Sequence, residues 1–133
     1  MAYRILEHTA DVGIEATSPD IPTLFDEAVR ATAAVTLDRD PPPATGHVPV
    51  SAEAGDLAAL LAALLSEALW TFESTGRLPV GARLEVSETS AAGSFGVVEG
   101  VETAGPAIKA VTYHQLLVER TAEGFRARVF FDV

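Results

Sequence analysis

The composition of this 133-residue chain indicates a single globular domain. Hydrophobic residues make up 48% and charged residues 21%, which argues against disorder, and the absence of cysteine excludes disulfides, thiolate zinc sites and cysteine nucleophiles. The net charge of −10 disfavours direct nucleic-acid binding, because that function needs Lys and Arg to neutralise phosphates. The negative charge is compatible with binding of a divalent cation, with docking on a basic partner surface, or with solubility alone.

The first part of the chain predicts two strands and a helix. Residues 3–7 and 12–17 alternate as strands do on either side of a polar turn at 8–11. Asp20 is the expected N-cap of a helix over 20–37, in which Thr32 shares the apolar stripe. That stripe consists of Ile21, Leu24, Phe25, Ala28, Val29 and Val35.

The middle of the chain predicts an edge strand and a core helix. Residues 46–53 alternate, and Pro49 favours an edge position. Asp56 is the expected cap of the strongest helix and Gly76 its stop. The apolar face of that helix comprises Leu57, Leu60, Leu61, Leu64, Leu65, Ala68, Leu69 and Phe72.

The remainder predicts strands. The ranges 78–88 and 93–102 are joined through 89–93, and the range 107–120 leads to a turn at 121–124 and a final strand over 125–133. We therefore expect an α+β fold, in which two main amphipathic helices pack on a mostly antiparallel sheet within one domain, 1–133. The N-terminus lacks a secretory signal pattern and the longest apolar run, 57–65, is too short to span a bilayer, so we expect a cytoplasmic protein without a membrane partner.

An aspartate lies beside a strand at each end of the chain, Asp11 near the start and Asp132 as the penultimate residue. Two carboxylates that meet repel each other unless one takes a proton or a cation binds between them. With the terminal carboxylate of Val133 they would suit a hard ion such as calcium or magnesium. Alternatively, Asp11 bonds the amides of its own turn and Asp132 pairs with an arginine. Spacing alone does not show that the two ends meet.

Two other residues are weaker candidates. His8 precedes Asp11 by three residues, a spacing that is common by chance and that favours a turn histidine. Lys109 lies in an apolar alternating run, which favours a solvated strand lysine. No phosphate-binding glycine loop, Gly-x-Ser-x-Gly elbow or paired-histidine zinc helix is present.

The register of the last hairpin decides which residue lies opposite Asp132. If Thr121 pairs with Gly124, that residue is Tyr113, with Lys109 on the same face. If Gly124 forms a bulge, it is His114. The sequence leaves both registers open.

Four blocks resemble the archease family: His-Thr-Ala-Asp-Val-Gly at 8–13, Thr-Leu-Phe at 23–25, Ile-Lys-Ala-Val-Thr-Tyr-His at 108–114, and Phe-Asp-Val at 131–133. The resemblance extends over nearly the whole chain in the same order. It implies an accessory protein, not an enzyme, whose partner is the RtcB-type RNA ligase of tRNA splicing and RNA repair. Such a protein promotes guanylylation of the ligase with GTP and sustains multiple turnover.

The resemblance also implies a site. It places a divalent cation, calcium with magnesium or manganese as alternatives, on Asp11, Asp132 and Val133, and it assigns Lys109 and His8 to the surface that activates the partner. The segment 100–107 departs from the family pattern, because it is shorter and nearly uncharged. Two other functions remain open: a metal-dependent hydrolase that uses Asp11 and Asp132 with His8 as acid and base, and a general chaperone-like module.

Overall fold

The structure, a computed structural model, describes residues 2–8 and 11–133, with the backbone alone for Glu7 and His8. Helices and strands alternate in the first half and strands follow in the second. In chain order they are β1 (Ala2–His8), β2 (Asp11–Ser18), α1 (Ile21–Leu37), β3 (Gly46–Glu53), α2 (Leu57–Thr75), β4 (Leu78–Val86), β5 (Ser90–Val98), β6 (Ala110–Thr121) and β7 (Gly124–Asp132).

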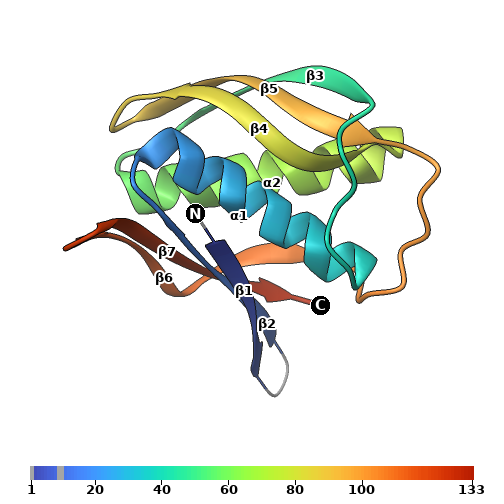
Figure 1. The fold of residues 1–133 in the computed structure, drawn as a ribbon, viewed down its shortest axis with the longest axis horizontal. Coiled ribbons are helices and arrows are strands. Elements are labelled where there is room, and N and C mark those ends of the chain that lie inside the picture. Colours follow the sequence, from blue (N-terminus) through green and yellow to red (C-terminus); the bar gives the residue numbers. More distant parts are fainter. Residues whose placement is uncertain (1, 9–10) are drawn as a thin grey trace.

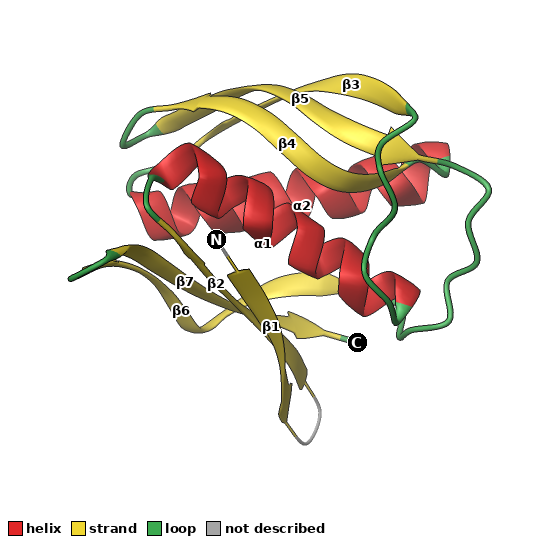
Figure 2. Ribbon diagram, viewed as in Figure 1, coloured by secondary structure: helices red, strands yellow, loops and turns green. Residues whose placement is uncertain are grey.

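The strands form two antiparallel sheets with both helices between them (Figures 1 and 2). The first sheet has the order β1-β2-β7-β6 and the second the order β3-β5-β4. This is the predicted α+β class, but with two sheets in place of one. Strand alternation shows that a sheet has an apolar face, and it does not show which strands share that sheet.

The core lies between the two sheets, where both helices contribute side chains with no exposed surface. Large members are Leu24, Phe25, Leu60, Leu61, Leu64 and Leu65 from the helices, Phe95 from the second sheet, and Val129 and Phe131 from the first. Because α1 is covered from both sides, its second half is buried beyond the predicted stripe and includes Ala31, Ala33 and Ala34. The hydroxyl of Thr32 donates to the carbonyl of Ala28 (2.8 Å), as predicted for a threonine on this face.

Local signals fix the helix ends as predicted. The Asp20 carboxylate accepts the amide of Thr23 (2.9 Å), and the Asp56 carboxylate accepts that of Ala59 (2.8 Å). Gly76 ends α2 with a left-handed φ of 75°, and its amide donates to Phe72.

Helix α2 is long and apolar enough by composition to cross a membrane, with 19 residues and a mean hydropathy of 1.4. Four of its leucines, Leu60, Leu61, Leu64 and Leu65, are buried, and the helix contacts strands of both sheets, so the core accounts for this part of its apolar composition. The apolar run identified in the sequence, 57–65, is shorter than the helix that contains it.

Candidate functional site

The structure places Asp11 directly opposite Asp132 on the adjacent strands β2 and β7. Ile14, Val129 and Phe131 face the helices and are at most 1% exposed. Because side chains alternate along a strand, both aspartates lie on the opposite face, which we call the outer face of the first sheet. Directly opposed side chains on antiparallel strands have Cβ atoms about 4.5–5.5 Å apart. The fold therefore brings the two ends of the chain together as a pair of carboxylates.

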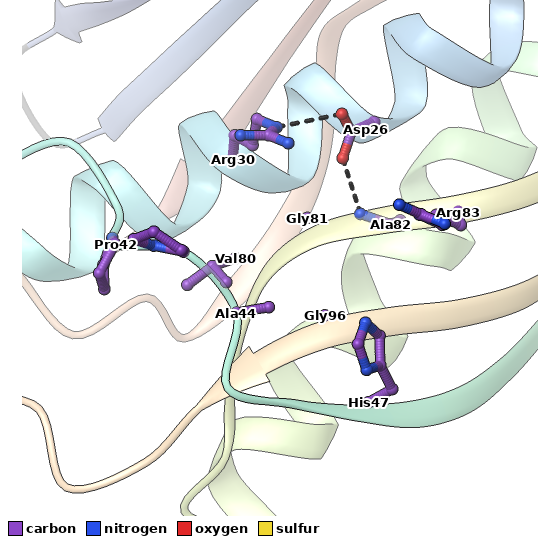
Figure 3. Close-up of a pocket in the computed structure, with 11 residues that line it drawn as sticks. Asp26, Arg30, Pro42, Ala44, His47, Val80, Gly81, Ala82, Arg83 and Gly96 are labelled. Atoms are coloured by element: carbon purple, nitrogen blue, oxygen red, sulfur yellow. Dashed lines mark hydrogen bonds and ion pairs between the residues drawn. The ribbon is translucent and has the colours of Figure 1, made fainter.

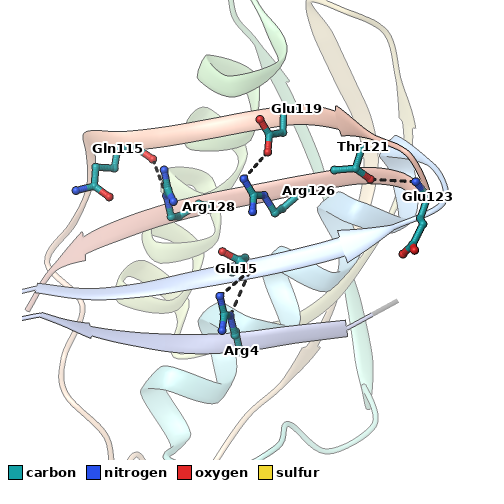
Figure 4. Close-up of polar contacts among 8 residues, drawn as sticks. All are labelled: Arg4, Glu15, Gln115, Glu119, Thr121, Glu123, Arg126 and Arg128. Atoms are coloured by element: carbon teal, nitrogen blue, oxygen red, sulfur yellow. Dashed lines mark hydrogen bonds and ion pairs between the residues drawn. The ribbon is translucent and has the colours of Figure 1, made fainter.

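Elsewhere on the outer face, cross-strand neighbours carry opposite charges (Figure 4). Glu15 lies opposite both Arg4 and Arg128, and its Oε1 is 3.1 Å from Arg4 Nη2. Arg126 forms an ion pair with Glu119 across β7 and β6. At the end of the sheet, by contrast, the like charges of Asp11 and Asp132 face each other. Like charges directly opposite destabilise a sheet unless a positive charge compensates for the repulsion.

The row that contains the pair offers no compensating cation among its described side chains. Beyond Asp132 the next partner is Ala110 on β6, and Asp11 pairs on its other side with His8, whose side chain lies outside the described part of the structure. The predicted ion pair between Asp132 and an arginine is absent from the described ion pairs. Arg4 and Arg126 instead pair with Glu15 and Glu119, and Arg128 donates to the carbonyl of Gln115.

The chemistry of the donor set suits a hard divalent cation. Asp11 and Asp132 supply carboxylate oxygens, and Val133 follows Asp132 directly in the chain. No three or more His, Asp or Glu side chains gather to hold a metal ion among those that the structure describes.

Lys109 is joined to Asp132 through the backbone. Its amide donates to the Asp132 carbonyl (2.8 Å), immediately before β6 begins. Its side chain lines a cavity of about 590 Å³ between α2 and the segment 99–109, which we call the α2 cavity. The cavity lies on the helix side of the sheet, so Lys109 adjoins the carboxylate pair without facing it.

Neither predicted hairpin register places the right residue opposite Asp132. Thr121 does pair with Gly124, but Ala110, and not Tyr113 or His114, lies opposite Asp132. The reason is a bulge, because residues 113–116 of β6 stand opposite Val129 alone and Gln115 has a φ of 53°. At the bulge, the centroid of the His114 ring lies 6.0 Å from the centroid of the Phe130 ring.

Phe130 supports the carboxylate pair from the neighbouring row. It faces the outer side and yet is only 7% exposed, because Gly13 opposite it has no side chain. A Cβ at position 13 would lie 2.6 Å from the Phe130 ring. The glycine of the 8–13 block is therefore needed for the packing of β2 against β7 beside the aspartates.

Comparison with known proteins identifies the family. The sequence profile described as the Archease protein family matches residues 3–133. The chain belongs to the archease family. It is 33% identical to the protein archease of Methanosarcina acetivorans over 98% of this chain and 95% of that one, and 28% identical to that of Archaeoglobus fulgidus over both full lengths.

Two solved structures share this archease fold. The solution structure of Methanobacterium thermoautotrophicum protein 1598 has a TM-score of 0.69 at 21% identity and covers 98% of each chain. A crystal structure from Thermotoga maritima, described as an archease and possible chaperone, has a TM-score of 0.66 at 22% identity and covers 96% of this chain and 94% of that one. At this identity the likeness shows the fold.

A second cavity in this archease-family chain lies beside a contact that joins α1 to the second sheet (Figure 3). It measures about 230 Å³ and lies where α1 meets the second sheet. There the Asp26 carboxylate accepts the amide of Ala82 on β4 (2.8 Å) and the Nε of Arg30 (3.0 Å). One oxygen of Asp26 thus attaches α1 to the edge strand β4, and the other pairs with Arg30 on the same helix.

The α2 cavity was not predicted from the sequence. Leu69 and Phe72 were assigned to the apolar face of the helix, which is correct, but they also line this cavity together with Ile108 and Pro106. The segment 99–109 is irregular, and hydrophobic periodicity gives no signal for where an irregular segment lies.

Proposed function

We propose that this chain is an activator of an RtcB-type RNA ligase and promotes the ligase's guanylylation with GTP. In that reaction a nucleophile of the ligase forms a bond to the α-phosphorus of GTP and pyrophosphate leaves. Membership of the archease family supports the proposal. The ligase is the enzyme, and the chain acts by binding it.

The opposed pair Asp11 and Asp132 is the observation that carries the proposal. A divalent cation held there, calcium with magnesium or manganese as alternatives, would supply positive charge for phosphate oxygens. Because the pair is at the end of the first sheet and Asp132 is exposed, a partner's groups could reach an ion held there. Lys109, joined to Asp132 by its amide, and His8 would belong to the same activating surface.

The experiment is to measure ligase–GMP formation with substoichiometric amounts of the chain. The wild type should raise the rate, and Asp132→Asn should abolish the rise, because it removes a charge from the pair without changing the side-chain size. Glu123→Gln is the matched control: it removes an exposed charge in the β6–β7 turn and should stimulate like the wild type. Absence of stimulation by the wild-type chain with its cognate ligase would refute the proposal.

A chaperone-like role is a second candidate, because the Thermotoga relative is described as a possible chaperone. It predicts that the chain suppresses aggregation of unrelated unfolded proteins and that Asp132→Asn does so equally well. A metal-dependent hydrolase would instead show turnover by the purified chain alone with the cation added, and that turnover would be lost in Asp132→Asn.

A further inference from the structure

The α2 cavity adjoins Lys109, the residue just before β6. Its walls are mostly apolar, with one acidic and one basic group, Glu73 and Lys109. The other lining residues are Thr36, Leu69, Phe72, Thr103, Gly105, Pro106, Ala107 and Ile108. An apolar hollow with a few polar groups is the composition expected of a binding site.

The outer wall of the cavity is held in place at two points. The amide of Gly105 donates to the carbonyl of Thr36 at the end of α1 (3.0 Å), and the amide of Lys109 donates to the carbonyl of Asp132 (2.8 Å). The segment also packs so closely that a Cβ at position 105 would lie 1.9 Å from the carbonyl oxygen of Val35. The cavity is therefore preformed, which lowers the entropic cost of binding.

An exposed tryptophan stands on α2 next to the cavity. Trp70 follows the lining residue Leu69, and 63% of its surface is exposed. Glu67 and Glu73 lie three residues to either side of it, so they are its neighbours on the exposed surface of α2. Tryptophan is the residue most enriched among those that dominate binding energy at protein interfaces.

We propose that the α2 cavity receives an apolar side chain of the partner ligase, from a segment that carries lysine or arginine beside it. This rests on the proposed function. Lys109 lines the cavity and its amide donates to Asp132, so the cavity and the carboxylate pair lie at the same end of the first sheet, on its two sides. A partner that covers this end would contact both. Glu67 and Glu73, in a chain of net charge −10, favour a basic segment.

A protein segment fits these features better than a small molecule or RNA. A small molecule in the cavity would leave Trp70 exposed on the helix surface, whereas a protein segment would cover the tryptophan and the cavity together. The two glutamates repel phosphates, which disfavours RNA.

The test is a substitution that adds a large side chain to the cavity and leaves its large lining side chains in place. Ala107 is exposed and lines the cavity, so Ala107→Trp should occupy the space from the rim. Ala122→Trp is the matched control. It adds the same side chain to the exposed β6–β7 turn, at the end of the β6–β7 hairpin that lies away from the cavity (Figure 1). Thr103→Trp, which fills the cavity from another exposed position, replaces Ala107→Trp if that variant does not fold.

The dissociation constant of the chain–ligase complex and the guanylylation rate at saturating chain are both measured. Ala107→Trp should bind about tenfold more weakly, while its stimulation at saturation stays at the wild-type level, because Asp11 and Asp132 are unchanged. Trp70→Ala should also weaken binding, and Ala122→Trp should not.

Wild-type affinity of a folded Ala107→Trp variant would overturn the inference while leaving the proposed function intact. A wild-type chain that binds the ligase without stimulating it would instead refute the proposed function alone. If the wild type does not bind the ligase, or if Ala107→Trp abolishes binding of an RNA or a nucleotide and not of the ligase, the inference is wrong.

Discussion

Gly13 and Phe130 are cross-strand partners on β2 and β7, and the Phe130 ring fills the space that a side chain at position 13 would need. The two residues occupy the row next to Asp11 and Asp132. The position of the carboxylate pair therefore depends on the absence of a single methyl group.

Gly13→Ala should lower the free energy of unfolding by about 1–3 kcal/mol, because the buried Phe130 ring must move to admit the added methyl group. Chemical denaturation measures the change. Gly55→Ala is the control, because a Cβ there meets nothing within 4 Å, and its effect should be small. Equal stability of Gly13→Ala and the wild type would mean that the ring packs elsewhere in solution.

The carboxylate pair should make the thermal stability depend on divalent cations. Without such ions, Asp132→Asn should melt at a higher temperature than the wild type, because it removes the repulsion across β2 and β7. Calcium should raise the melting temperature of the wild type by mass action and leave that of Asp132→Asn nearly unchanged. Scanning calorimetry with calcium or with a chelator tests both effects, and an equal calcium shift in the two proteins would place the ion elsewhere.

Two substitutions of Asp26 distinguish its hydrogen bond to β4 from its ion pair with Arg30. Asp26→Ala should cost about 1–3 kcal/mol, because the partly buried Ala82 amide loses its acceptor. Asp26→Asn keeps an acceptor oxygen and loses only the exposed ion pair with Arg30, so its cost should be smaller. Urea midpoints of the three proteins decide the order, and a greater loss in Asp26→Asn would contradict it.

Signals that act over a few residues were sufficient to predict much of this fold. Asp20, Asp56 and Gly76 mark helix ends through their own hydrogen bonds and φ angles. The sequence also predicts the turn at 121–124, but it leaves open whether Thr121 pairs with Gly124, as it does in the structure. The 113–116 bulge could not be predicted, because the register beyond the turn depends on contacts such as that of His114 with Phe130. The division into two sheets likewise depends on which strands meet.

The candidate site shows the same limit. The sequence identified Asp11 and Asp132 as acids beside strands, but their approach is a property of the register between β2 and β7. The α2 cavity depends on where an irregular segment lies, which Gly105 determines by a close contact with α1. Neither relationship is encoded in a local pattern.

Tyr3 should lose its hydroxyl proton at a higher pH than an ordinary tyrosine. Its hydroxyl donates to the Asp40 carboxylate, and burial together with this bond raises the pKa of Tyr3 from 10.0 to about 12. Because the folded-state pKa is raised, the stabilisation is present below the unfolded pKa and is lost as the pH rises through about 12. Tyrosinate absorbance should show this step, which Tyr3→Phe removes and Tyr113→Phe retains. Asp40→Asn should lower the pKa of Tyr3; no change would mean that the hydrogen bond is absent.

Glu27 should make the protein less stable at neutral pH than a neutral residue would. Burial raises the pKa of its carboxyl, and the nearby Arg30 only partly opposes this. A raised folded-state pKa means that the stabilisation from this group is complete below the unfolded value of 4.5 and is lost as the pH rises through the folded value. Glu27→Gln should therefore have a higher urea midpoint than the wild type at neutral pH, and this advantage should shrink as the pH falls through the raised folded-state pKa to 4.5. Glu85→Gln removes an exposed charge on β4 and should show no such trend; a pH-independent gain in Glu27→Gln would rule out titration of Glu27 as the cause.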